Sequence, residues 1–194
     1  MCASPHPDRD RKLPRLKDFD YANDGAYFIT ICTANRANIF GEIQNDKMVL
    51  NESGRVAEKC WREIPDHFPN AKLDEFVVMP NHVHGLIWIE NSNKIIKRVG
   101  NADLRSLQIP CSPQTQSQKI DRTKMAIPKI IHGFKSSVTR IIRQQNSATH
   151  SVWQKSFHDH VIRDDDELNR IRDYIWQNPK NWEKDENNFS AVRK

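Results

Sequence analysis

Two short groups of residues have the types and spacing to carry chemistry. The first is His82-Val83-His84, which lies inside the apolar segment 82–90. On a β-strand, residues two apart point to the same face, so both imidazoles could bind one metal ion. Two surface histidines on a hairpin would give the same triplet. The triplet alone therefore leaves both interpretations open.

The second group is Tyr174 and Asn178, which lie four residues apart just before Pro179. On a helix this spacing puts both side chains on one face. Tyrosine can act as a covalent nucleophile, but its ordinary pKa of about 10 means that a cation or base must assist it. The Asn178 amide oxygen could be a third ligand for the same ion. An ordinary half-buried tyrosine with its hydroxyl in water is the alternative.

Together the two groups fit phosphoryl transfer in DNA. A metal ion would polarise the scissile phosphate, and the tyrosine would attack in line, leaving a 3′-hydroxyl and a 5′-phosphotyrosine. The phosphotyrosine bond stores the energy for rejoining, which agrees with the absence of a Walker A pattern. The zinc-deaminase and H-E-x-x-H patterns are also absent, and Leu86 stands where a third alternating histidine would suggest a nucleotide hydrolase.

The distribution of charge points to a nucleic-acid partner. Residues 93–143 carry a net charge of +9, whereas residues 1–92 carry −3 and residues 144–194 carry −1. A basic block of this kind suits a phosphate backbone, although a solvated basic loop would look the same. The candidate phosphate contacts on or near the helix predicted in this block are Lys129, Lys135, Arg140, Arg143 and Lys155. Trp88 and Trp176 are expected to pack in the core.

Four segments in a fixed order resemble a known family. They are YFITICTANR, MPNHVHGLIWIE, IPKIIHGFKSSVTR and VWQKSFHDHVIRDDDELNRIRDYIWQNP. Together they resemble IS200/IS605-type transposases, which are single-tyrosine enzymes of the HUH class, and most closely the REP-associated tyrosine transposases. The resemblance extends over about residues 20–182.

This resemblance implies a set of roles. His82, His84 and Asn178 would bind Mg²⁺ or Mn²⁺, with Tyr174 as the nucleophile. Two imidazoles and an amide are softer ligands than Mg²⁺ usually takes, and by ligand type alone they favour Mn²⁺ or Zn²⁺. The implied substrate is single-stranded DNA that carries a hairpin, and the implied fold is RRM- or ferredoxin-like. Relatives include both monomers and homodimers, so either state is expected.

The elements that must position these residues follow from the apolar periodicity. Strands are predicted over residues 26–33, 73–79, 82–90 and 152–163, and a hairpin or edge strand over 41–50. Helices are predicted from Asn51 or Ser53 to about residue 68, over 127–145, and from 164 to about 178, with Pro65 ending or kinking the first. The predicted fold is therefore α+β, with an antiparallel sheet of about four to five strands and helices packed on it.

The chain is predicted to form a single domain over residues 20–182, with a flexible arm at 1–19, a polar basic insertion at 91–126 and a tail at 183–194. No apolar run approaches the roughly 20 residues of a membrane span, and no signal peptide is expected. Four scattered cysteines fit free thiols in the cytoplasm, and a nucleoid-associated location is expected.

Other interpretations stay open. A second triplet, His158-Asp159-His160, is expected to serve packing or substrate contact more than metal binding. A non-cleaving protein that binds hairpin DNA is the main alternative function. A metal-dependent phosphoesterase that acts on small nucleotides would explain the histidines but neither Tyr174 nor the basic block.

Overall fold

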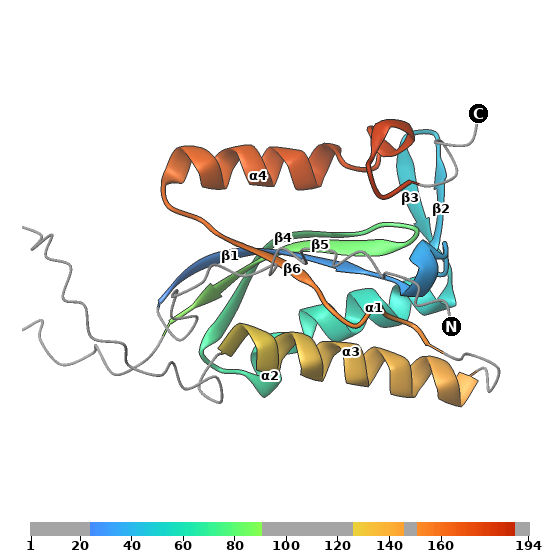
Figure 1. The fold of residues 1–194 in the computed structure, drawn as a ribbon, viewed down its shortest axis with the longest axis horizontal. Helices are drawn as coiled ribbons and strands as arrows, with labels where there is room; N and C mark the ends of the chain where they lie inside the picture. The colour runs from blue at the N-terminus through green and yellow to red at the C-terminus, as the bar shows by residue number, and fades with distance from the viewer. Residues whose placement is uncertain (1–23, 91–125, 146–150, 189–194) are drawn as a thin grey trace, which may run out of the picture.

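The computed structural model describes residues 24–90, 126–145 and 151–188 of the chain (Figure 1). Four strands form one antiparallel sheet in the order β4-β5-β1-β6. They are β1 (Gly25–Cys32), β4 (Ala71–Val78), β5 (His82–Ile89) and β6 (His158–Val161). This arrangement confirms the predicted α+β class with an antiparallel sheet.

The helices cover both faces of this sheet. α1 (Glu52–Arg62), α2 (Ile64–His67) and α3 (Ala126–Gln145) lie on one face, and α4 (Asp165–Gln177) lies on the other (Figure 1). Asn51 caps α1 by accepting a hydrogen bond from the Gly54 N–H, 3.0 Å away. The predicted first helix is interrupted at Glu63, and Pro65 lies in the first turn of α2, as expected of a proline.

β5 alternates between the two faces. Val83, Ile87 and Ile89 belong to the main core beneath α1 and α3, whereas Leu86 and Trp88 belong to a smaller cluster beneath α4. By the same alternation His82 and His84 point to the α4 face. Seven of the eight residues of β5 are buried because both faces of this strand are covered.

Gly85 lets α1 approach the strand between these residues. A Cβ atom at this position would overlap the indole of Trp61, which is fully buried. The Trp61 ring also contacts Phe134 of α3 edge-on, with 5.2 Å between ring centroids. The main core therefore packs directly against the backbone of the strand that carries the histidines.

Some predicted elements differ from those observed. The predicted strand over 152–163 is wrong in extent, since only His158–Val161 forms β6. Residues 41–50 form the predicted hairpin, β2 (Gly41–Gln44) and β3 (Lys47–Leu50), so the alternative of an edge strand in the main sheet does not hold. The left-handed turn between them uses Asn45 and Asp46, with φ of 49° and 60°.

Three expectations fall outside the described residues. These are the arm at 1–19, nearly all of the insertion at 91–126 and the last six residues of the chain. Within the described ranges, no helix combines the length and apolarity needed to cross a membrane.

Candidate active site

The histidine pair lies at the start of β5, beneath the C-terminal half of α4. His82 and His84 are 0% and 2% exposed, and their ring centroids lie 4.4 Å apart. The structure thus brings the two imidazoles together on one face, as their spacing predicts. They are buried, so the alternative of two surface histidines does not hold.

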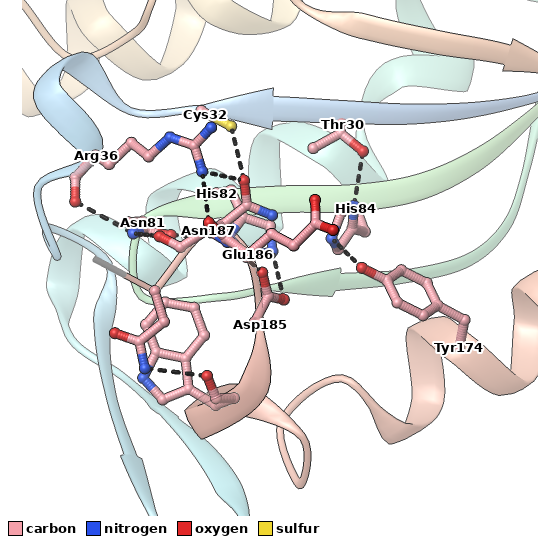
Figure 2. Close-up of polar contacts among 12 residues, drawn as sticks. Thr30, Cys32, Arg36, Asn81, His82, His84, Tyr174, Asp185, Glu186 and Asn187 are labelled. Carbon is pink, nitrogen blue, oxygen red and sulfur yellow. Dashed lines mark hydrogen bonds and ion pairs between the residues drawn. The ribbon is translucent and has the colours of Figure 1, made fainter. Parts of the chain in front are cut away.

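A hydrogen bond from His82 to Asn81 fixes the tautomer of His82 (Figure 2). The Asn81 Nδ2 donates to the carbonyl oxygens of Arg36 and Asn187, at 3.2 and 2.8 Å. Its Oδ1 therefore faces the His82 Nδ1, 2.8 Å away, and accepts a hydrogen bond from the Nδ1–H. The Nε2 of His82 then carries a lone pair. This atom is buried and has no hydrogen-bond partner among the described residues.

His84 is held in a comparable way. Its Nδ1 lies 2.8 Å from the Oγ1 of Thr30, its cross-strand neighbour on β1. Its Nε2 faces the hydroxyl of Tyr174 at 3.3 Å. Each histidine thus has its Nδ1 occupied by an orienting partner and its Nε2 directed into the site, an arrangement typical of metal-binding imidazoles.

Burial keeps both imidazoles neutral. It lowers the pKa of His82 to about 3, with a further contribution from the positive charge of Arg36. Burial also lowers the pKa of His84 well below its ordinary value, and the neighbouring His82 adds to this effect while Asp185 opposes it. Neutral imidazoles have the free lone pair that a metal ligand needs.

Tyr174 projects from α4 toward this pair and is 45% exposed. The Phe28 ring packs against both His84 and Tyr174, with centroid distances of 5.3 and 6.0 Å. Burial raises the pKa of Tyr174, and the negative charge of Asp185 raises it further, while a hydrogen bond from Asn178 lowers it. A cation bound beside the phenol would oppose the effect of Asp185.

Asn178 follows the last residue of α4 and is 2% exposed. Its Oδ1 has no hydrogen-bond partner among the described residues. An unsatisfied buried acceptor costs about 1–3 kcal/mol, so a ligand for this oxygen would be stabilising. Its position beside Tyr174 agrees with the predicted one-turn spacing.

Asp185 is a member of the site that the sequence analysis missed. It follows η4 (Trp182–Lys184), and its side chain is 5% exposed. One ligand atom from each of His82, His84 and Asp185 lies within 4.8 Å of the others. The three residues, drawn in Figure 2, form a cluster that could hold a divalent cation. No periodic pattern in the sequence links Asp185 to the histidines, so its place in the site was not predictable.

The helix that carries Tyr174 is fixed at two points. Asp164 caps its N-terminus by accepting from the Glu167 N–H at 2.7 Å. Farther along, Arg172 donates to Asp74 of β4 from its Nε at 3.0 Å, and the Trp88 Nε1 donates to the same carboxylate at 3.0 Å. These hydrogen bonds lower the pKa of Asp74 to about 2. The partly buried ion pair between Arg172 and Asp74 therefore holds α4 in place over the sheet.

The second histidine triplet lies apart from this cluster. His158 and His160 are exposed on β6, and the His160 Nε2 lies 2.7 Å from a carboxylate oxygen of Glu167 in the first turn of α4. Within the described residues His160 thus serves to join β6 to α4. This contact agrees with the expected packing role.

The structure places the predicted phosphate contacts on or near α3, across the sheet from Tyr174. Lys129, Arg140, Arg143 and Lys155 are exposed. Lys135 instead donates to the carbonyl oxygens of Gln154 and Ser156, both at 2.9 Å. An open groove of about 570 Å³ separates the second half of α3 from residues 151–153, and Arg140 and Arg143 line it.

Trp176 contradicts the expected core role. It is 79% exposed, whereas Trp88 packs in the small cluster beneath α4 as expected. Ile171 and Ile175 form the inward stripe of α4. The residue after Ile175 is turned about 100° away from this stripe.

Comparisons with known proteins agree with this fold. The chain is 39% identical over 176 residues to a Haemophilus influenzae protein whose name states no function, covering 91% of this chain and 92% of that protein. It is 24% identical over 161 residues to a second protein of that organism, named "Putative REP-associated tyrosine transposase", covering 82% of this chain and 73% of that protein. No protein-family model matches the sequence.

Among solved structures, a REP-associated tyrosine transposase bound to a REP hairpin has a similar fold. The TM-score is 0.50 and the identity 16%, with 81% of this chain and 68% of that chain covered. The likeness is one of fold, that is, of the antiparallel sheet and the helices packed on it. The chain thus shares its fold with a solved REP-associated tyrosine transposase and is similar in sequence to a protein of that name, which agrees with the resemblance found in the order of its motifs.

Proposed function

We propose that this protein is a metal-dependent single-stranded DNA endonuclease and strand transferase that cleaves through a 5′-phosphotyrosine. The observation that carries the proposal is the position of Tyr174. Its hydroxyl lies 3.3 Å from the Nε2 of a buried, neutral His84, and it is still half exposed and accessible to a DNA strand.

The residues divide the chemistry among them. Tyr174 loses its phenolic proton to solvent as its oxygen attacks phosphorus, the bond from phosphorus to the 3′-oxygen breaks, and the departing 3′-oxygen takes a proton from solvent. His82, His84 and Asn178 are the ligands that the resemblance implies, and the unsatisfied Nε2 of His82 and Oδ1 of Asn178 fit that role. A bound Mg²⁺ or Mn²⁺ would supply charge stabilisation at the scissile phosphate.

The proposed substrate is single-stranded DNA next to a hairpin. The solved REP-associated transposase binds a REP hairpin, and the exposed basic side chains of α3 give this chain a surface for a phosphate backbone. Lys129, Arg140, Arg143 and Lys155 are the proposed contacts. Lys135 stays a candidate, although its ammonium already donates to two carbonyl groups. The protein would act in the cytoplasm on the nucleoid, as a monomer or homodimer.

A denaturing gel tests the proposal. The protein is incubated with labelled hairpin DNA from repeats flanking its own gene, with Mn²⁺ or Mg²⁺. We expect a covalent protein–DNA band that disappears with EDTA and in Tyr174→Phe. Tyr27→Phe would be an unsuitable control because Tyr27 is buried in the core, so Tyr21→Phe is the matched control and should keep the band. Tight hairpin binding with no band under either metal would instead support the non-cleaving alternative.

A further inference from the structure

Residues 182–188 form a segment that folds back over the histidine pair, and we call it the clasp. The Trp182 ring lies over His82 with 6.0 Å between centroids. Asp185 and Asn187 lie on the same segment, close to the start of β5 (Figure 2). The clasp comes after α4 in the chain and contacts His82 and Asn81 of the site.

The two carboxylate oxygens of Asp185 have different surroundings. Oδ1 accepts a hydrogen bond from the Asn187 N–H at 2.6 Å, inside the clasp. Oδ2 faces the Nε2 of His82 at 3.9 Å. The first oxygen thus fixes the rotamer of the side chain, and the second is directed at the buried imidazole.

The His82 Nε2 and the Asp185 Oδ2, which face each other, are both hydrogen-bond acceptors. The Asn81 amide fixes the proton of His82 on Nδ1, so Nε2 presents a lone pair to the Asp185 oxygen. Two buried acceptors that face each other without a hydrogen between them repel. A cation that accepts both lone pairs removes this repulsion, and His84 supplies a third ligand atom within 4.8 Å.

Asn81 and Arg36 anchor the clasp to the sheet. Arg36 donates from one guanidinium nitrogen to the Asn187 Oδ1 at 2.6 Å and to the Glu186 carbonyl at 3.3 Å. Asn81 donates to the Asn187 carbonyl while it orients His82. One side chain therefore connects the position of the clasp to the orientation of a histidine.

We infer that Asp185 is the carboxylate ligand of the metal ion, and that metal binding and docking of the clasp depend on each other. This inference deepens the proposed function and rests on it. Asn81 is a positioning residue in this arrangement. The clasp makes the metal site complete within one chain.

The charge of the site favours a carboxylate ligand in addition to the two histidines and Asn178. Two neutral imidazoles and an amide leave both positive charges of a divalent ion uncompensated in a buried site. A carboxylate neutralises one of these charges and is a harder ligand, which suits Mg²⁺ and Mn²⁺. Asn178 keeps its proposed role beside Asp185, because its Oδ1 has no hydrogen-bond partner among the described residues while its amide N–H donates to the Tyr174 phenol.

Calorimetric titration with Mn²⁺ tests the ligand assignment in the full chain, without DNA. Loss of an outer partner of a metal ligand typically weakens binding about 10- to 100-fold, so Asp185→Asn should weaken Mn²⁺ binding by at least about 100-fold. Asn81→Ala should weaken it about 10-fold. Glu183→Gln removes an exposed carboxylate from the same segment and should change the affinity less than about 2-fold.

Hydrogen exchange tests the clasp. Mn²⁺ should slow exchange of the amides of residues 182–188 at least about 10-fold in the wild type and in Glu183→Gln, but not in Asp185→Asn. Amides of β1 and β5 should exchange equally slowly in all three proteins, which shows that each variant is folded. An Asp185→Asn protein that binds Mn²⁺ as tightly as the wild type would overturn the inference, as would a wild type without measurable Mn²⁺ binding.

The assignment of Asp185 as a metal ligand and the proposed DNA cleavage can be refuted separately. Wild-type protein that binds Mn²⁺ through Asp185 but forms no covalent DNA band would overturn the proposed function and leave the metal assignment in place. Asp185→Asn protein with normal Mn²⁺ affinity and a normal covalent band would overturn the assignment and leave the proposed function in place.

Discussion

The two faces of the sheet differ in what they contain. The face beneath α1 and α3 carries the main core, in which Trp61, Ile87, Ile130 and most of their neighbours are fully buried. The α4 face has a small apolar cluster around Leu86 and, beside it, the Nε2 of His82 and the Oδ1 of Asn178, which are buried and have no hydrogen-bond partner among the described residues. The first face supplies the stability that allows the second to keep an energetically costly arrangement of polar atoms.

β5 carries side chains on both faces of the sheet. A shift of this strand would therefore move residues on both faces. Val83 and Ile87 hold it to the core, while His82 and His84 point the other way. A change in the core can therefore move the histidines, whereas loss of Tyr174, which is half exposed, should leave the core unchanged. The following predictions test this asymmetry.

The largest effect on stability is expected from the core face. Trp61→Ala removes a fully buried indole between Phe76 and Phe134, and large-to-small changes of aromatic core residues cost about 3–5 kcal/mol. Urea unfolding should show this loss. Tyr174→Phe should stay within about 0.5 kcal/mol of the wild type. Comparable destabilisation by both variants would refute the division between the faces.

Gly85→Ala tests the coupling through β5. The added methyl group would overlap the Trp61 indole, and overpacking of a core costs about 1–3 kcal/mol. The strand must shift to relieve the overlap, so the distance between His84 and Tyr174 should also change. We expect lower stability in urea together with weaker Mn²⁺ binding. Unchanged metal affinity despite lower stability would show that the two faces act independently.

The ion pair between Asp74 and Arg172 should give α4 a pH-dependent anchor. The pKa of Asp74 lies at about 2 rather than at its ordinary 3.8, so its contribution is present in full above pH 3.8 and is lost as the pH falls through about 2. The Arg172 side chain is 38% exposed, and after allowance for screening the contribution is about 1–2 kcal/mol.

Unfolding of the wild type and Asp74→Asn should be compared across the acidic range. The difference in free energy of unfolding should be largest near neutral pH and should shrink as the pH approaches about 3. Asp173→Asn is the matched control, because this carboxylate of α4 is exposed and makes no ion pair among the described residues. A difference that grows on acidification would contradict the sign of the pKa shift.

The smallest effect is expected from the exposed basic side chains of α3. Arg140→Gln should weaken hairpin binding about equally for different sequences and reduce the salt dependence of binding by about one phosphate contact. Stability should stay unchanged because Arg140 is exposed. Fluorescence anisotropy at several salt concentrations measures this. Gln144→Ala on the last turn of α3 is the neutral control, and equal salt slopes for wild type and Arg140→Gln would remove Arg140 from the proposed contacts.

The parts of the site that were predictable are those that follow a regular period. The spacing of two on a strand correctly placed His82 beside His84, and the spacing of four on a helix placed Tyr174 near Asn178. Order and type of the main strands followed from the same periodicities. The roles assigned to these residues remain proposals.

The parts that were not predictable depend on irregular segments. Asp185 reaches the histidines through the clasp, whose path is set by hydrogen bonds from Arg36 and Asn81 that no local pattern reveals. The strand predicted over 152–163 is interrupted before His158, and Lys135 binds the carbonyl oxygens of residues 154 and 156 in this interruption. The prediction that Trp176 packs in the core was wrong. It rested on the apolar side chain, whereas the position of Trp176 one residue beyond the inward stripe of α4 turns it toward solvent.

The most direct test of Tyr174 as the nucleophile is to identify the residue that becomes covalently bound to DNA. The protein–DNA complex formed with Mn²⁺ is digested with protease and nuclease, and the modified peptide is sequenced by mass spectrometry. We expect a nucleotide joined through its 5′-phosphate to Tyr174. A nucleotide on any other residue, or a cleaved strand with no modified peptide, would contradict it.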